Sequence, residues 1–138
     1  MDYIKMTEEF ITAMDQDKGK EIDNRDSLNI LRLRMKLISE ETNEVEEAVA
    51  DLEKCIAESG TKEELIRYKA ALLKELCDLQ YVLSGFAVTF GLPFDEAFRK
   101  VHESNMSKLG DDGKPVYRED GKVLKGPNYK KPDLSDLV

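Results

Sequence analysis

LISEETNEVEEAV, residues 37–49, sets acidic residues among apolar ones at helical spacing, and KELCDLQYVLSG, residues 74–85, does the same. Glu41 and Glu44 are three residues apart, as are Glu75 and Asp78. In a helix each pair projects from one face, with its β-carbons about 5–6 Å apart. Four converging carboxylates repel one another unless a cation lies between them, and oxygen ligands suit Mg²⁺ or Mn²⁺. These stretches therefore predict a metal site and phosphate chemistry.

The sequence around both pairs predicts an all-α fold. Between residues 28 and 57 the apolar spacing alternates between three and four, as on the packing face of a helix. The positions on this predicted face are Leu31, Met35, Ile38, Thr42, Val45, Val49 and Leu52. A shorter helix is expected over residues 2–17. A third begins after Thr61, which forms a capping box with Glu64, and ends at Gly91.

Pro93 opens a fourth helix that is expected to run to about Met106, after which glycines and prolines exclude a long helix. The prediction is an antiparallel bundle of four main helices in one domain, residues 1–138. Its helical core covers about residues 2–106, and its irregular tail covers about residues 107–138. The Asp-Gly pair at residues 120–121 makes a small β-hairpin plausible within that tail.

Both acidic pairs have the same angular offset from the predicted packing faces, which places them on the flank of a shared core. A solvated helix face is the ordinary explanation of a single acidic pair. Two pairs at the same angular offset argue against a solvated face as the explanation. The seven acids without any Lys or Arg between residues 40 and 53 argue against it as well. Like charges at this spacing destabilise a helix, and bound cations would offset the repulsion.

Composition narrows the class of protein. The net charge of −8 and the pI of about 4.8 disfavour nucleic acid and anionic membrane surfaces as partners. Cys55 and Cys77 form no C-x-x-C unit, and no apolar run has the length of a signal peptide or membrane span, so we expect a reduced, cytoplasmic protein. The single histidine, His102, excludes a ferritin-like di-iron site, which needs two Glu-x-x-His units.

The two acidic stretches resemble the E-E-x-x-E and E-x-x-D motifs of the all-α nucleoside triphosphate pyrophosphohydrolases. This superfamily contains MazG, the dimeric dUTPases, dCTP pyrophosphatase and phosphoribosyl-ATP pyrophosphohydrolase. The segments SNMSKLG (residues 104–110) and KGPNY (residues 125–129) resemble a phosphoribosyl-ATP pyrophosphohydrolase-like subgroup. The likeness extends from about Phe10 to Leu134.

The resemblance implies that Glu41, Glu44, Glu75 and Asp78 bind Mg²⁺, for which Mn²⁺ could substitute. Glu40 would be an extra ligand or would orient the attacking water.

Other residues are candidates for substrate binding. Asn105 and Lys108 resemble family residues that hold phosphate or sugar, although a helix cap and a solvated lysine are the plainer interpretations. Tyr81 shares the face of Asp78 and could donate to a phosphate, or could be a core tyrosine. Lys125 and Tyr129, in a tail with seven Lys or Arg against four Asp or Glu between residues 107 and 131, could form a strap over the substrate.

The activity implied by the family is cleavage of a nucleotide to a nucleoside monophosphate and pyrophosphate. A non-standard or pyrimidine deoxynucleoside triphosphate is the first candidate substrate, for sanitation of the nucleotide pool. Phosphoribosyl-ATP, in histidine synthesis, is the second. A regulatory helical module that binds metal and nucleotide without turnover is the alternative from another class. The family also implies a homodimer or higher homo-oligomer.

Overall fold

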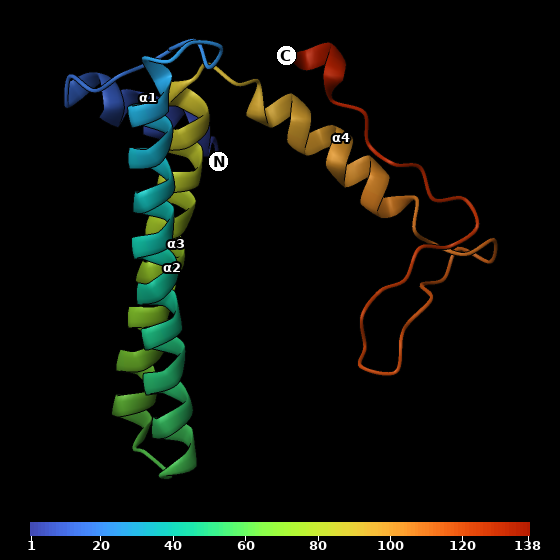
Figure 1. Cartoon of the computed structure of the whole chain (residues 1–138). Helices are drawn as coiled ribbons and strands as arrows, with labels where there is room; N and C mark the ends of the chain where they lie inside the picture. Colours follow the sequence, from blue (N-terminus) through green and yellow to red (C-terminus); the bar gives the residue numbers. More distant parts are fainter. The chain divides into compact units, whose positions relative to one another are not determined.

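Four α-helices and a terminal 3₁₀ turn make up the regular structure of the computed structural model, which describes residues 1–138 (Figure 1). The helices are α1 (Tyr3–Ala13), α2 (Ser27–Ala57), α3 (Lys62–Thr89) and α4 (Phe94–Met106), followed by η1 (Ser135–Leu137). The chain divides into two compact units, Met1–Gly91 and Leu92–Val138, which are described separately. The predicted all-α class with four main helices is confirmed. None of the helices is long and apolar enough to cross a membrane.

In the first unit, α2 and α3 run antiparallel alongside each other over their whole length (Figure 1). The buried residues of α2 recur every seven positions, at Ser27, Arg34, Ala48 and Cys55. This repeat keeps one face of the helix against its partner. Glu41 falls in the same series and is half-buried.

The predicted packing face of α2 is right in part and wrong at two positions. Five of its members are half-buried, namely Leu31, Ile38, Thr42, Val45 and Leu52. Met35 and Val49 were expected inside but are 54% and 38% exposed, whereas their neighbours Arg34 and Ala48 are buried. The seven-residue series that packs beside the predicted positions contains Ser27, Arg34 and Glu41, so apolar spacing alone does not identify it. As a result Glu41 lies within the packing face, where a flanking position was expected.

The turn between α2 and α3 is closed by local hydrogen bonds. The N–H of Gly60 donates to the carbonyl of Cys55 at 2.8 Å. Thr61 then starts α3 with the predicted capping box: its hydroxyl accepts from the Glu64 N–H at 3.2 Å, and the Glu64 carboxylate accepts from the Thr61 N–H at 2.8 Å. Both bonds satisfy amides that the first turn of a helix leaves without partners.

α1 packs against the C-terminal half of α3. Its buried residues, Thr7 and Ile11, lie over Gly85, where a β-carbon would stand 3.7 and 3.8 Å from their methyl groups. α1 ends four residues earlier than expected, and Asp15, with φ of 54°, turns the chain. The following loop closes the other end of α3, because the N–H groups of residues 19 and 20 donate to the carbonyls of residues 88 and 89 at 3.1 and 2.7 Å.

In the second unit the tail folds back along α4. The Ser104 hydroxyl donates to the Lys130 carbonyl at 2.7 Å, and the Lys130 N–H donates to the Ser107 hydroxyl at 2.8 Å. Gly126 lies so close to Lys108 that a β-carbon there would be 2.5 Å from the Lys108 carbonyl oxygen, which explains the glycine. The suggested hairpin is reduced to one antiparallel bridge, between residues 117 and 123, and no strand forms.

Replacing Thr61 with Ala should destabilise the protein by about 1 kcal/mol, because both bonds of the capping box are lost or weakened. Thr61→Ser keeps the hydroxyl and serves as the matched control. Urea denaturation followed by circular dichroism measures both free energies of unfolding. Equal stability of the two variants would contradict a stabilising role for the cap.

Candidate active site

Three carboxylates meet between α2 and α3. Oxygen atoms of Glu41, Glu75 and Asp78 all lie within 4.8 Å of one another, and all three residues are half-buried. Glu41 is brought there by its place in the seven-residue series of α2. Glu75 comes from the facing side of α3, and its side chain is only 16% exposed. The helix packing therefore brings together one member of the first predicted pair and both members of the second.

The Glu41 carboxylate has an unused hydrogen-bonding oxygen. Its Oε2 atom is buried and has no hydrogen-bond partner. A buried carboxylate oxygen without a partner costs free energy, and more so beside two like charges. An oxygen-seeking divalent cation bound among the three groups would satisfy it, so these residues fit a metal such as Mg²⁺ or Mn²⁺.

Lys74 supplies a positive charge to the same group. Its Nζ atom lies 2.7 Å from Asp78, 3.1 Å from Glu75 and 4.0 Å from Glu44. The hydrogen bond to Asp78, and then that to Glu75, raises the pKa of Lys74 above its usual value. The sequence analysis missed this residue, although the spacing of Lys74 and Asp78, four residues on a helix, was a signal for it.

Glu44 lies beside the three carboxylates and is more exposed than they are. A hydrogen bond to Glu75, followed by the charge of Glu41, raises the pKa of Glu44 above its usual value. This shift shows how closely the acids approach one another.

Glu40 points elsewhere. Its carboxylate pairs with Lys36 one turn earlier on α2, at 3.6 Å, and both side chains are exposed. Exposed pairs of this kind contribute little to stability, so the pair opens readily.

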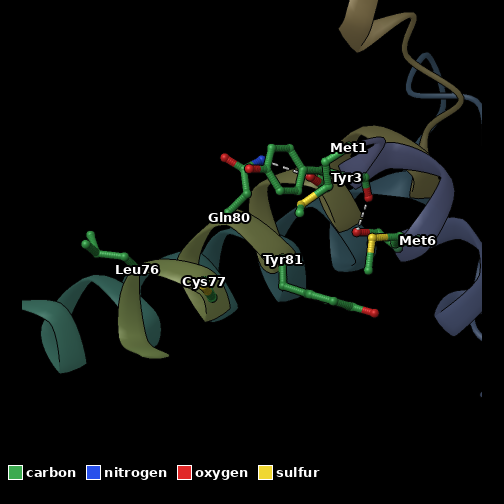
Figure 2. A pocket seen from close by; sticks show the side chains of 9 residues that line it. Met1, Tyr3, Met6, Leu76, Cys77, Gln80 and Tyr81 are labelled. Carbon is green, nitrogen blue, oxygen red and sulfur yellow. Dashed lines mark hydrogen bonds between the residues drawn. The ribbon is translucent and has the colours of Figure 1, made fainter. Parts of the chain in front are cut away.

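Tyr81 lies one turn beyond Asp78, on the wall of an open pocket of about 440 Å³ between α1 and α3. Figure 2 shows Tyr3 and Met6 of α1 facing Gln80 and Tyr81 of α3 across it. The Tyr81 ring also packs edge to face on Phe10, with centroids 5.5 Å apart. The pocket is mainly apolar and large enough for a nucleobase.

The remaining predicted substrate-binding residues belong to the second unit. Asn105 is exposed at the end of α4, and its carbonyl accepts from the Lys108 N–H at 3.2 Å, so a helix-ending role is present. Lys125 lies over the ring of Tyr129, with Nζ 4.6 Å from its centroid. All four of these predicted residues belong to the second unit, namely Asn105, Lys108, Lys125 and Tyr129. The carboxylates belong to the first unit.

Neither Ser104 nor Ser107 has an acid–base partner of the kind a hydrolase triad needs. Ser104 and Ser107 both donate to backbone carbonyls, at 2.7 and 2.6 Å. These two serines therefore do not form a hydrolase triad.

Comparison with known families agrees with this geometry. The phosphoribosyl-ATP pyrophosphohydrolase family, PRA-PH, matches residues 7–105. The chain belongs to this family. The match covers well over half of the chain, from α1 through both acidic pairs to Asn105. Among curated proteins, no sequence matches it significantly.

Membership confirms the resemblance to the all-α nucleoside triphosphate pyrophosphohydrolases. This PRA-PH protein is a pyrophosphohydrolase, an enzyme that hydrolyses phosphoric anhydride bonds. Members of the family are typically metal-dependent, in keeping with the carboxylates of α2 and α3.

Lys74→Met should strengthen the binding of Mn²⁺ by about fivefold, because a positive charge near the site costs a divalent ion about 1 kcal/mol even at high dielectric. Isothermal titration calorimetry measures the affinity without turnover. Lys69→Met, elsewhere on α3, is the matched control and should bind as the wild type does. Unchanged or weaker binding by Lys74→Met would show that this lysine does not compete with the cation.

Proposed function

We propose that the chain hydrolyses a nucleoside triphosphate to a nucleoside monophosphate and pyrophosphate, with Mg²⁺ as its cofactor and Mn²⁺ as a possible substitute. The carboxylate group of Glu41, Glu75 and Asp78, in a chain of the PRA-PH family, is the observation that carries this proposal.

In this proposal each acid has its own role. Glu41, Glu75 and Asp78 hold the cation, and Glu44 completes the set by turning from its present place. When bound, Mg²⁺ neutralises phosphate oxygens and lowers the pKa of a water molecule. Glu40 orients that water once its weak pair with Lys36 opens. Because the proposed attacking group is water, the protein needs no nucleophile of its own.

The pocket beside Tyr81 is the proposed place of the base. Its lining residues Leu76 and Cys77 stand between Glu75 and Asp78 in the sequence of α3, which supports a location near the carboxylates. A base held there leaves the phosphates of the same nucleotide within reach of the acids. Tyr81 then contributes an aromatic surface for the base and a hydroxyl for a phosphate.

There are two candidate substrates. The family match supports phosphoribosyl-ATP, the substrate of the histidine pathway, at least as well as the deoxynucleoside triphosphate expected from the sequence. The second candidate, a non-standard or pyrimidine deoxynucleotide, is supported by the likeness of the acidic motifs to the MazG-like enzymes.

Pyrophosphate release over a panel of nucleotides tests both candidates. The panel contains phosphoribosyl-ATP and the standard and modified deoxynucleoside triphosphates, each with Mg²⁺ and with EDTA. Glu41→Gln and Asp78→Asn should lose activity by at least a hundredfold, about 3 kcal/mol of transition-state stabilisation. They should fold as well as the wild type without metal, because each removes one of several repelling charges.

Glu46→Gln, also an acid on α2, is the matched control and should remain active. Near-normal Mg²⁺-dependent activity of Glu41→Gln or Asp78→Asn would contradict the proposed site. Activity that is the same in EDTA would contradict the proposed cofactor.

The tail is proposed to cover the phosphates, with Asn105 holding phosphate or sugar and with Lys108, Lys125 and Tyr129 as the strap. The excess of positive charge between residues 107 and 131 supports this. Lys108→Ala should lower kcat/KM by about ten- to a hundredfold, since charge-assisted contacts contribute roughly 1.5–3 kcal/mol. Lys114→Ala, in the same tail, is the control, and an equal effect of the two substitutions would argue against a specific role for Lys108.

We further propose a single functional domain and a cytoplasmic homodimer or higher homo-oligomer, with nucleotides as its small-molecule partners and neither nucleic acid nor membrane. Free Cys55 and Cys77 support a reducing compartment. Large apolar side chains exposed on α2 and α3 support self-association, among them Met35, Ile66 and Leu73.

A further inference from the structure

Arg34 is a buried charge that the proposed reaction does not use. Only 8% of its surface is exposed, and its Nε atom is buried without a hydrogen-bond partner. Its one protein bond is a long contact of 3.5 Å from Nη2 to the Gln16 side-chain oxygen. Loss of hydration lowers the pKa of Arg34, and the charge of Asp17 only partly opposes this.

A buried guanidinium normally has a carboxylate or another anion as its partner. Here no carboxylate lies within ion-pair distance of Arg34, although α1, α2 and α3 enclose it. On the α3 side, Gly85 faces the guanidinium and has no side chain that could act as a hydrogen-bond partner. The protein therefore retains a costly unpaired cation at a fixed place.

Arg34 lines an open pocket of about 650 Å³ in the first unit. Lys18 and Lys20 contribute two more cations from the loop that follows α1. This loop is held in place, because the N–H groups of Gly19 and Lys20 are bonded to the end of α3. The pocket is thus a built feature of the fold.

Acids of the pocket are already paired or lie at its rim. Asp17 pairs with Lys20 at 3.2 Å, while Lys18 pairs with Glu8 at 3.1 Å. These side chains are about half exposed, and such pairs exchange partners at little cost. Asp15 is also on the lining and is exposed. Both lysines can therefore turn to an incoming anion, while Arg34 already faces it.

We propose that this pocket is a binding site for a phosphate-bearing anion, with Arg34 as its fixed anchor and Lys18 and Lys20 as adjustable ligands. A phosphate group offers oxygens in several directions and so can bond to a guanidinium and two ammonium groups at once. A carboxylate can satisfy the guanidinium alone and leaves most of the pocket empty. The site does not depend on the proposed hydrolase function.

The site is separate from the carboxylates but close to them. Arg34 precedes Glu41 by two helical turns on the same face of α2, a rise of about 10 Å. The anion could therefore be free pyrophosphate or phosphate, or a phosphate of a bound nucleotide. The two sources share the same chemistry at Arg34.

Thermal unfolding in EDTA isolates this site, because without a cation the neighbouring carboxylates repel anions. Pyrophosphate, orthophosphate and AMP are tested separately at 5 mM, against NaCl of equal ionic strength and against acetate. At least one phosphate compound should raise the Tm of the wild type and of Arg32→Met, an exposed arginine on the same helix. Arg34→Met should abolish the rise, and Lys20→Met should reduce it.

A rise with pyrophosphate or orthophosphate identifies a free anion as the ligand, and a rise with AMP alone identifies a nucleotide phosphate. If Arg34→Met does not fold, ¹H–¹⁵N spectra of the wild type replace it, and the Arg34 Nε–H resonance should shift on addition of the same compound. No rise beyond NaCl, an equal rise with acetate, or an equal rise in Arg34→Met would overturn the proposal. Binding here with no pyrophosphate release in the nucleotide panel would leave this site intact and remove the hydrolase proposal alone.

Discussion

Glu41 and Glu75 meet between two packed helices, where a carboxylate loses part of its hydration and stands beside others of the same sign. The packing of α2 against α3 maintains this arrangement. The seven-residue repeat that buries Ala48 and Cys55 also places Glu41 at the interface between the two helices. Repulsion between these carboxylates therefore destabilises the folded state locally. That strain is relieved only by positive charge, which explains why Lys74 lies against the acids and why a divalent cation fits among them.

Two open pockets of this helical unit differ in character. One, between α1 and α3, is mainly apolar, and the other, beside α2, carries the cationic side chains of Arg34, Lys18 and Lys20. The loop after α1, which lines the second of these pockets, is held by its bonds to the end of α3. A nucleotide has an apolar base and charged phosphates, so the two kinds of surface suit the two parts of such a ligand.

Much of this structure could be predicted from the sequence. Helix class and the capping box follow from local rules, and the acidic pairs follow from helical spacing. The exposure of Met35 and Val49 did not, because both are more apolar than Arg34 and Ala48, the neighbours that are buried instead. Only the partner helix decides which stripe is covered.

The separation of Glu40 from the acids, and the contacts of Lys74 with Glu75 and Glu44, could not be derived from the pattern for a related reason. Side chains on neighbouring faces of a helix differ by one position in sequence, and their choice of partner depends on the rotamers that packing allows. The same applies to the tail. Its glycines and prolines predicted irregular structure, but the bonds of Ser104 and Ser107 to Lys130 join residues more than twenty positions apart.

Paramagnetic broadening by Mn²⁺ tests the central claim most directly, that a divalent cation binds among Glu41, Glu75 and Asp78. Substoichiometric Mn²⁺ should broaden the ¹H–¹⁵N signals of these three residues and their helical neighbours first, and excess Mg²⁺ should restore them. Broadening centred on the exposed acids near Glu46 and Glu53, or spread evenly over the surface, would contradict the claim.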